Sequence, residues 1–215
     1  MRALLTGFAP FPGVPVNASM RLVRELEAAA KGVFPGTTLS VAVLPTEWLA
    51  APRQLEILIE QARPDLLLHF GVSNGARGFE LELRGQNRCV LEPDAAGSLP
   101  AAEAVDAGGP EVMRVTVPVA WIVFRLRQRG IPAFLSHDAG GYLCNATLYH
   151  SLAKARHAPG RRVGFIHIPA GLANPATNRL GRASACPLTW SQAIDGGLEI
   201  LAACLNRSGL PARPR

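Results

Sequence analysis

Cys144 is the residue whose sequence context best suits covalent chemistry. It lies in the segment Ser136–Asn145, in which Gly140 and Gly141 predict a tight turn before a helix. The thiolate is the nucleophilic form of cysteine, and free N–H groups in the first turn of a helix favour an anion. The same N–H groups can stabilise an oxyanion during acyl transfer. We therefore predict that Cys144 is a nucleophile; the alternative is an inert buried cysteine.

A nucleophilic thiol needs a base, and His167 is the best-placed histidine. It lies near the end of the apolar run Gly164–Pro169, which is typical of a buried strand. Ligands of open α/β sheets bind at the carboxyl ends of the strands, so a histidine there can face a cleft. The alternative is a core histidine bonded to backbone. His69 lies in a similar run and His137 precedes the glycine turn, so neither is preferred.

The base needs an orienting acid, and two carboxylates compete for this role. Glu80 and Glu82 lie on the same face of the run Phe79–Leu91, which begins with alternating apolar and polar residues. Either could hold the imidazole of His167 in the tautomer that accepts a proton from Cys144. The alternative is a solvated strand face. Together, the thiol, the imidazole and the carboxylate predict a cysteine hydrolase.

Other chemistries have weak support. The cysteines form no Cys-x-x-Cys pair and the histidines show no paired spacing, so we expect no metal and no cofactor. The sequence lacks the Gly-x-x-x-x-Gly-Lys run of a phosphate-binding loop and the Gly-x-Ser-x-Gly elbow of serine hydrolases. We interpret Cys89, Cys186 and Cys204 as structural.

The composition is typical of a globular protein rather than a disordered one. The chain has 215 residues, 48% of them apolar, and a formal net charge of +6. The arginines are scattered, with part of the excess at Arg161–Arg162 and Pro211–Arg215, so we expect a solvated basic surface and no nucleic acid. The apolar runs are too short for a signal peptide or a membrane span, and we expect free thiols in a reducing cytoplasm.

Apolar strands alternate with amphipathic helices along the chain. Strands are predicted at 3–6, 38–44, 65–70, 114–117, 133–136 and 163–168. Helices are predicted at 18–31, 47–62, 120–129, 145–156 and 189–205, the last with Thr189 as its N-cap. This alternation implies parallel strands joined by crossover helices. We predict an α/β fold, a three-layer α/β/α domain with a mixed, mostly parallel, open twisted sheet.

Two segments depart from this alternation. Phe79–Leu91 has a period of two, which predicts a strand or hairpin exposed on one face. Asp94–Gly109 is rich in Ala, Gly and Pro, which predicts a long loop. Because we find neither an internal repeat nor a linker, we expect residues 1–215 to form a single domain, with 209–215 as a disordered tail.

Taken together and in order, the motifs resemble those of pyroglutamyl peptidase type I, a cysteine exopeptidase family also called pyrrolidone carboxyl peptidase. Thr6–Gly13 is similar to the family's Thr-Gly-Phe-x-Pro-Phe-Gly-Gly opening and is followed by Asn17. Ala139–Asn145 is similar to Ala-Gly-Thr-Tyr-Leu-Cys-Asn, and Phe165–Pro169 completes the set. The likeness therefore runs almost from end to end.

The resemblance implies that a Cys-His-Glu triad removes an N-terminal pyroglutamyl residue from a peptide. The triad maps onto Cys144, His167 and Glu82, and counting from Gly71 to Asn87 against the family pattern selects Glu82. The implied partners are a small peptide with a blocked N-terminus and further copies of the chain in a homo-oligomer. No metal or cofactor is implied.

Five residues are implied to bind the substrate: Phe8, Phe11, Asn17, Gly71 and Val72. The two phenylalanines would sandwich the lactam ring, and Asn17 would help to order their loop. A neutral lactam suits an apolar slot with a few polar contacts. The alternative interpretation of the phenylalanines is ordinary core packing.

The chain departs from the family pattern at four places, the first being Pro12-Gly13 in place of Gly-Gly. The family's Gly-Gln-Ala-Gly-Gly-Arg is replaced by Gly71–Arg77, its Glu-Arg-x-Ala-x-Asn by Glu82–Asn87, and an arginine by Glu92. A carboxylate at position 92 is expected to oppose thiolate formation. Two alternatives therefore remain: a related cysteine amidohydrolase acting on another small amide or cyclic imide, and a catalytically weak homologue that binds small ligands.

Overall fold

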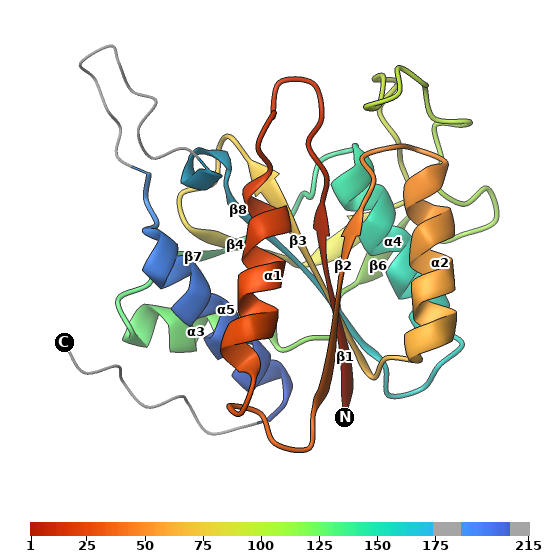
Figure 1. Ribbon diagram of the computed structural model, residues 1–215. Helices are drawn as coiled ribbons and strands as arrows, with labels where there is room; N and C mark the ends of the chain where they lie inside the picture. The colour runs from red at the N-terminus through yellow and green to blue at the C-terminus, as the bar shows by residue number, and fades with distance from the viewer. Residues whose placement is uncertain (174–185, 207–215) are drawn as a thin grey trace, which may run out of the picture.

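Six strands form one sheet in the computed structural model, which describes residues 1–173 and 186–206 (Figure 1). The order across the sheet is β2-β1-β3-β8-β4-β7, so several neighbours are distant in sequence and are joined by crossovers. The strands are β1 (Arg2–Phe8), β2 (Thr38–Leu44), β3 (Leu66–Ser73), β4 (Phe79–Glu82), β7 (Ala133–Ser136) and β8 (Arg162–Pro169).

The sheet is mixed and mostly parallel, as predicted. Strand β1 pairs in parallel with β2 and β3, and β3 pairs in parallel with β8. Strand β4 runs antiparallel to β8, and the edge strand β7 is parallel to β4. The carboxyl ends of β1, β3 and β8 therefore meet at one edge of the sheet, where open α/β folds bind their ligands.

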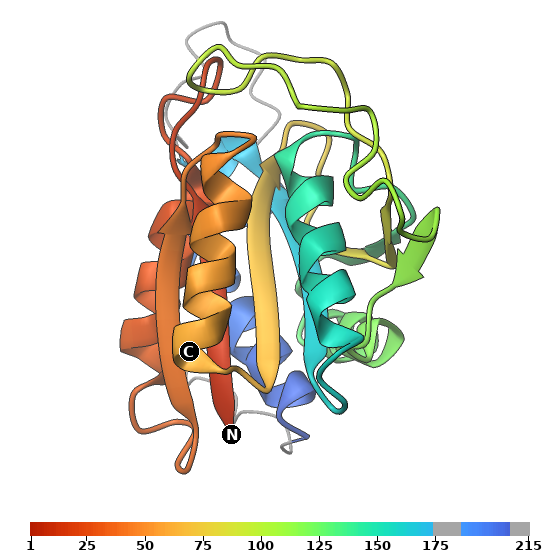
Figure 2. The same ribbon diagram turned by 90° about the vertical axis from the view of Figure 1, so that its right-hand side faces the viewer.

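Helices cover both faces of the sheet and complete the three predicted layers (Figure 2). Helices α1, α3 and α5 pack on one face, and α2 and α4 pack on the other. The buried strand β3 contacts both layers, because Leu66, Leu68 and Phe70 belong to the first apolar cluster and Leu67 to the second. The helices are α1 (Ala18–Ala30), α2 (Ala50–Ala62), α3 (Val119–Gln128), α4 (Leu143–Ala155) and α5 (Trp190–Cys204), with a short 3₁₀ helix η1 (Ala170–Ala173).

The helices begin in different ways. The side-chain oxygen of Asn17 accepts a hydrogen bond from the N–H of Ser19 (3.1 Å) and caps α1. Thr189 caps α5, as predicted, in a capping box with Gln192. Helix α4 differs because its N-cap residue, Tyr142, makes no side-chain cap bond. That side chain therefore leaves the first N–H groups of α4 to other acceptors.

Several predicted boundaries are off by one to three residues, and two predicted elements differ for a reason that the contacts show. The helix predicted at 47–62 begins at Ala50, because the N–H of Trp48 donates to the carboxylate of Asp94 (2.8 Å) and the preceding residues form a turn. The strand predicted at 114–117 is instead β6 (Val112–Arg114), which pairs with β5 (Arg84–Gln86) in a separate two-stranded sheet.

The run predicted as one strand or hairpin over 79–91 is divided between the two sheets. Strand β4 belongs to the main sheet and β5 to the small one, with Leu83 between them. The face that carries Glu82 is not exposed as expected, since that side chain is only 1% exposed. Residues 94–109 contain neither helix nor strand, as predicted. The predicted tail at 209–215 lies outside the described residues.

Candidate active site

Cys144 lies in the first turn of α4, two residues after the N-cap Tyr142. Gly140 adopts a φ of +80°, the left-handed region that favours glycine. Gly141 is needed for space, because a Cβ there would lie 2.6 Å from Cγ1 of Val90. The two glycines therefore permit the tight turn that leads into α4. The thiol of Cys144 then lies where the helix dipole favours a negative charge.

His167 lies near the carboxyl end of β8 and is paired with Glu82 on the adjacent strand β4. The distance between His167 Nδ1 and Glu82 Oε1 is 2.8 Å, and both side chains are buried. The carboxylate of Glu80, two residues earlier on the same strand face, accepts from the N–H of Arg77 (3.4 Å) instead. The structure therefore brings Glu82, rather than Glu80, to the imidazole.

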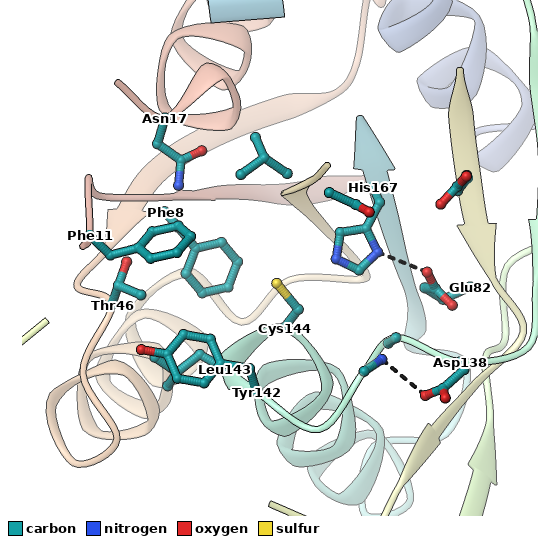
Figure 3. Close-up of a pocket in the computed structure, with 15 residues that line it drawn as sticks. Phe8, Phe11, Asn17, Thr46, Glu82, Asp138, Tyr142, Leu143, Cys144 and His167 are labelled. Carbon is teal, nitrogen blue, oxygen red and sulfur yellow. Dashed lines mark hydrogen bonds and ion pairs between the residues drawn. The ribbon is translucent and has the colours of Figure 1, made fainter. Parts of the chain in front are cut away.

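The sulfur of Cys144 points towards the His167 ring from the side opposite Glu82 (Figure 3). Burial alone would lower the pKa of His167. The negative charge and hydrogen bond of Cys144, followed by those of Glu82, outweigh that effect and raise the pKa of His167 to about 10. A proton on this imidazole is therefore retained at neutral pH, between a sulfur and a carboxylate.

Gly71 at the end of β3 makes room for the sulfur. A Cβ at this position would lie 3.0 Å from Cys144 Sγ and 2.8 Å from the ring of Phe165. Phe165 packs in turn against the His167 ring, with 4.8 Å between the ring centroids. Gly71 thus lies behind the thiol and is not among the residues that line the adjacent cavity, whereas the resemblance had implied a contact with substrate.

A cavity of about 310 Å³ lies beside the thiol and the imidazole. Its aromatic end is formed by Phe8 and Phe11, from the end of β1 and the loop that follows, and by Tyr142 (Figure 3). The ring centroids of Phe11 and Tyr142 are 6.2 Å apart, and Trp48 meets Tyr142 edge-on at 5.1 Å. This end suits a flat and largely apolar group.

The other implied substrate residues also lie at this cavity. Val72 lines it, and so does Asn17, whose Nδ2 donates to the carbonyl of Ala9 (3.2 Å) and ties the loop to the end of β1. Sequence reasoning missed further lining residues: Thr46, Ser73, Asp138, Ala139, Gly140 and Leu143. Most of these residues lie in the Cys144 motif or directly after Val72, so their closeness in sequence to predicted site residues could have identified them. Thr46 has no such neighbour.

The cavity is acidic at the end away from the phenylalanines. Figure 3 shows Asp138 on the opposite side of Cys144 from Phe8 and Phe11. Glu80 also lines the cavity, and Glu82 Oε2 is buried there without a hydrogen-bond partner. The cavity therefore combines an aromatic end, a thiol and an imidazole in the middle, and an end with three carboxylates, of which Glu82 is paired with His167 and Asp138 with Arg88.

Cys89, Cys204 and His69 lack this environment. Burial raises the pKa of the Cys204 thiol to about 12, and burial also raises the pKa of Cys89. His69 is enclosed between the hydroxyls of Thr6 (2.7 Å) and Ser151 (2.8 Å), and burial lowers its pKa to about 3. Within residues 1–173 and 186–206, no three His, Cys, Asp or Glu side chains are grouped so that they could hold a metal ion.

Glu92, which replaces an arginine of the family pattern, is exposed and is not among the residues that line the cavity. Its backbone carbonyl accepts the indole N–H of Trp48 (2.9 Å). Burial raises the pKa of Tyr142 first, and the charges of Asp94 and Glu92 add to that effect. An effect of Glu92 on thiolate formation stays a prediction.

A thiol, an imidazole and a carboxylate gathered at the carboxyl edge of an open α/β sheet are the arrangement of a cysteine hydrolase. The family model of the pyroglutamyl peptidases matches residues 1–200. The chain belongs to the pyroglutamyl peptidase family.

Individual relatives agree over most of their length. A pyrrolidone-carboxylate peptidase of Gloeobacter violaceus is 36% identical over 202 residues, covering 94% of this chain and 97% of the relative. The structure of a mutant pyrrolidone carboxyl peptidase of Pyrococcus furiosus superposes with a TM-score of 0.85 at 28% identity, covering 96% of this chain and 99% of that one. Pyroglutamyl peptidase I of Bacillus amyloliquefaciens gives a TM-score of 0.81 at 30% identity, covering 94% and 95%.

Proposed function

We propose that this protein is a cysteine exopeptidase that removes N-terminal pyroglutamyl residues from peptides, with Cys144 as nucleophile, His167 as base and acid, and Glu82 as the orienting carboxylate. One observation carries the assignment of roles. The 2.8 Å contact between His167 Nδ1 and Glu82 Oε1 leaves the other imidazole nitrogen to the sulfur of Cys144. Family membership supports the reaction, and this alignment of three side chains supports the roles.

The reaction begins with a proton on His167 and a thiolate at Cys144. The raised pKa of His167, about 10, keeps a proton on the imidazole at neutral pH. The thiolate attacks the carbonyl carbon of the pyroglutamyl amide, and the electron pair of the C=O bond moves to oxygen. The N–H groups in the first turn of α4, which the Tyr142 side chain does not cap, are proposed to donate to that oxyanion.

The tetrahedral intermediate then collapses. Nε2–H of His167 donates its proton to the amide nitrogen, the C–N bond breaks, and the shortened peptide leaves with a free amine. The pyroglutamyl group remains on Cys144 as a thioester. His167 next takes a proton from water, the hydroxide attacks the thioester carbon, and the C–S bond breaks to release pyroglutamate and restore the ion pair.

The aromatic end of the cavity is proposed to bind the pyroglutamyl ring. Phe8, Phe11 and Tyr142 line this end, and a five-membered lactam can pack against their rings. A ring at this end directs its carboxamide towards Cys144 and leaves the peptide chain to continue towards Asp138. The neutral ring needs no buried counter-charge, in agreement with the lack of charged side chains at this end of the described cavity.

Hydrolysis of pyroglutamyl-aminomethylcoumarin tests the function directly. The expected result is turnover by the purified protein and at least a ~10³-fold loss in Cys144→Ala. Prolyl-aminomethylcoumarin, which lacks the ring carbonyl, is the matched control and should not be hydrolysed. Turnover of other amides or cyclic imides alone would indicate the related amidohydrolase. No turnover, with Cys144 unreactive to iodoacetamide, would indicate a ligand-binding homologue.

We also propose that the protein works in the cytoplasm. All four cysteines are free, and a thiolate nucleophile needs a reducing compartment. Within the described residues, no helix combines the length and the apolar character needed to cross a bilayer. Activity should therefore be lost in oxidised glutathione and recovered with dithiothreitol, and the protein should fractionate with cytoplasmic markers.

Association with further copies of this chain is the expected quaternary state. Trp121 and Phe124 stack on the outer side of α3 at 5.3 Å and are 52% and 50% exposed, and Phe134 and Leu135 are exposed on the edge strand β7. Apolar side chains at a free sheet edge are typical of an interface between copies. Light scattering after size exclusion should give a multiple of the 22.8 kDa chain mass, and Trp121→Glu should reduce it.

A further inference from the structure

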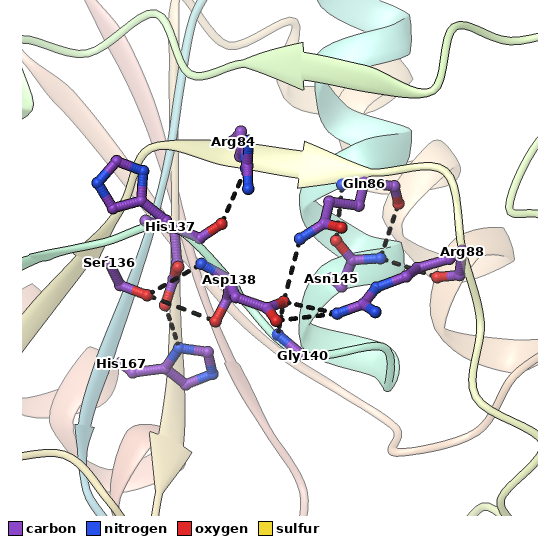
Figure 4. Close-up of polar contacts among 10 residues, drawn as sticks. Arg84, Gln86, Arg88, Ser136, His137, Asp138, Gly140, Asn145 and His167 are labelled. Carbon is purple, nitrogen blue, oxygen red and sulfur yellow. Dashed lines mark hydrogen bonds and ion pairs between the residues drawn. The ribbon is translucent and has the colours of Figure 1, made fainter.

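Asn145, the residue after the nucleophile, is completely buried and makes three hydrogen bonds to one distant segment (Figure 4). Its Oδ1 accepts from the N–H of Gln86 (2.8 Å), and its Nδ2 donates to the carbonyls of Gln86 (2.8 Å) and Arg88 (2.9 Å). The carboxamide thus pairs with both backbone groups of Gln86, as a neighbouring strand would. It fixes the first turn of α4 to β5.

Strand β5 is continuous with the strand that carries the orienting acid. Only Leu83 separates it from Glu82, the last residue of β4. The N–H of Leu83 donates to Ser136 (2.8 Å), and its carbonyl accepts from Val115 (3.1 Å). The backbone at Leu83 is therefore held in place, and β5 has a fixed position relative to Glu82. A residue bonded to β5 is therefore also fixed relative to Glu82.

The same segment also holds the loop that leads to the nucleophile. Arg84 Nε donates to the carbonyl of His137 (2.9 Å). The carboxylate of Asp138 accepts from Arg88 (2.9 Å to each oxygen), from Gln86 Nε2 (3.1 Å) and from the N–H of Gly140 (3.0 Å). Figure 4 shows these contacts on one side of Asn145. The chain before Cys144 and the chain after it are thus both bonded to residues 84–88.

We propose that Asn145 is a positioning residue, which sets the distance between the Cys144 sulfur and the His167–Glu82 pair by locking the first turn of α4 to β5. The proposal rests on the proposed function, because it concerns the geometry of that triad. Catalytic groups need placement to a fraction of an ångström, and a displacement of about 1 Å can cost about 10²-fold in rate. The three hydrogen bonds of Asn145 join the residue after the nucleophile to the segment that follows the acid Glu82.

Strand β5 and helix α4 approach each other so closely at Gly85 that an added side-chain atom would move them apart. A Cβ on Gly85 would lie 3.1 Å from the backbone nitrogen of Tyr149 and 3.2 Å from its Cα. These atoms are helix backbone and cannot rotate away, so an added methyl group must displace α4 by tenths of an ångström. Gly85→Ala therefore disturbs the same interface without removing a hydrogen bond.

Asn87 provides a matched control. It also makes three bonds to backbone: Oδ1 accepts from the N–H of Asp106 (2.9 Å), and Nδ2 donates to the carbonyls of Asp106 (2.7 Å) and Gly109 (3.2 Å). These bonds secure the loop at 94–109 and not α4. Asn87→Ala therefore removes the same chemical interactions as Asn145→Ala while leaving the nucleophile tied to β5.

The experiment compares Asn145→Ala, Gly85→Ala and Asn87→Ala with the unaltered protein at 15 °C, below their measured melting temperatures. We expect kcat for pyroglutamyl-aminomethylcoumarin to fall at least ~30-fold in Asn145→Ala with KM within about threefold, and to fall by a smaller factor in Gly85→Ala. Alkylation of Cys144 by iodoacetamide at pH 6.5 should slow at least ~10-fold in Asn145→Ala, because a thiol away from the imidazole is mostly protonated there. Asn87→Ala should change neither rate by more than about threefold.

The proposal is overturned if Asn145→Ala and Gly85→Ala keep both rates within threefold of Asn87→Ala, or if all three variants lose both rates in proportion to their loss of melting temperature. If Asn145→Ala does not fold, Gly85→Ala decides between these results. Alkylation requires no substrate, so it separates this proposal from the function. An unaltered protein without turnover but with rapid alkylation contradicts the proposed substrate and still tests the role of Asn145.

Discussion

Gly71 and Cys144 face each other so closely that a methyl group on the glycine would lie 3.0 Å from the sulfur. The ring of Phe165, which packs against His167, lies at 2.8 Å from the same point. Because Gly71, near the end of β3, has no side chain, the sulfur of Cys144 can occupy its position beside the imidazole of His167.

Gly71→Ala is expected to reduce kcat by about 10²-fold, because the sulfur or the Phe165 ring must move away from its place beside His167. Gly75→Ala is the control, since its added Cβ would meet only Ser73 Oγ at 3.8 Å. Steady-state kinetics on pyroglutamyl-aminomethylcoumarin measure both. Equal kcat values for the two variants would show that the space at Gly71 is not needed for catalysis.

The two carboxylates of β4 should differ in their effect on kcat. Glu82→Gln keeps the shape of the side chain but removes the charge that faces His167 Nδ1, so we expect kcat to fall about 10²- to 10⁴-fold. Glu80→Gln alters the rim of the cavity and should change mainly KM. The comparison of kcat and KM for the two variants is the measurement, and a larger loss of kcat in Glu80→Gln would reverse the assignment.

The residue pattern predicts the acid only as one of this pair, and the selection of Glu82 came from the family resemblance. Glu80 and Glu82 are two residues apart and share one strand face, so local pattern alone cannot separate them. The pairing of β4 with β8 and the packing around His167 decide between them. Cys144 has a local signal, the glycine turn before a helix, whereas the apolar run around His167 is shared by His69, so the strand context does not separate these two histidines.

The same limit applies to the fold. The long apolar runs of β1, β2, β3 and β8 are predicted by their own composition. Strands β5 and β6 span only three residues each and are defined by their mutual pairing, which no local pattern records. The start of α2 depends on Asp94, and the role of Asn145 depends on bonds to Gln86 and Arg88, all distant in sequence. Sequence reasoning missed Asn145 for this reason.

His69 should make folding stability depend on pH. Its pKa is about 3 in the folded protein because of burial, against about 6.5 in an unfolded chain. Between these values the unfolded chain binds a proton that the folded protein does not, so stability falls as pH falls below 6.5. We expect about 2 kcal/mol to be lost between pH 7.5 and pH 5 from this group.

Urea unfolding at the two pH values measures this loss. His69→Gln, if folded, should show a pH dependence smaller by about 2 kcal/mol, whereas exposed His157 provides the control His157→Gln, which should retain it. An identical pH dependence in the unaltered protein and in His69→Gln would contradict the assignment of a neutral buried imidazole.

The aromatic end of the cavity should contribute to binding more than to the chemical step. Phe11→Ala removes one wall that faces Tyr142, and we expect KM to rise about tenfold with kcat within about threefold. Ile57→Ala, on the exposed side of α2, removes an apolar side chain that does not line the cavity and should leave KM unchanged. A fall in kcat alone in Phe11→Ala would mean that this ring orients the scissile bond instead.

The most direct test of the central claim is trapping of the acyl-enzyme. Rapid acid quench of the unaltered protein with a pyroglutamyl substrate, followed by peptide mass mapping, should show a pyroglutamyl group on the peptide that contains Cys144. The same peptide should be unmodified in Cys144→Ser, in which turnover should be lost. Turnover that persists in Cys144→Ser, or an acyl group found on another residue, would contradict the assignment of Cys144 as the nucleophile.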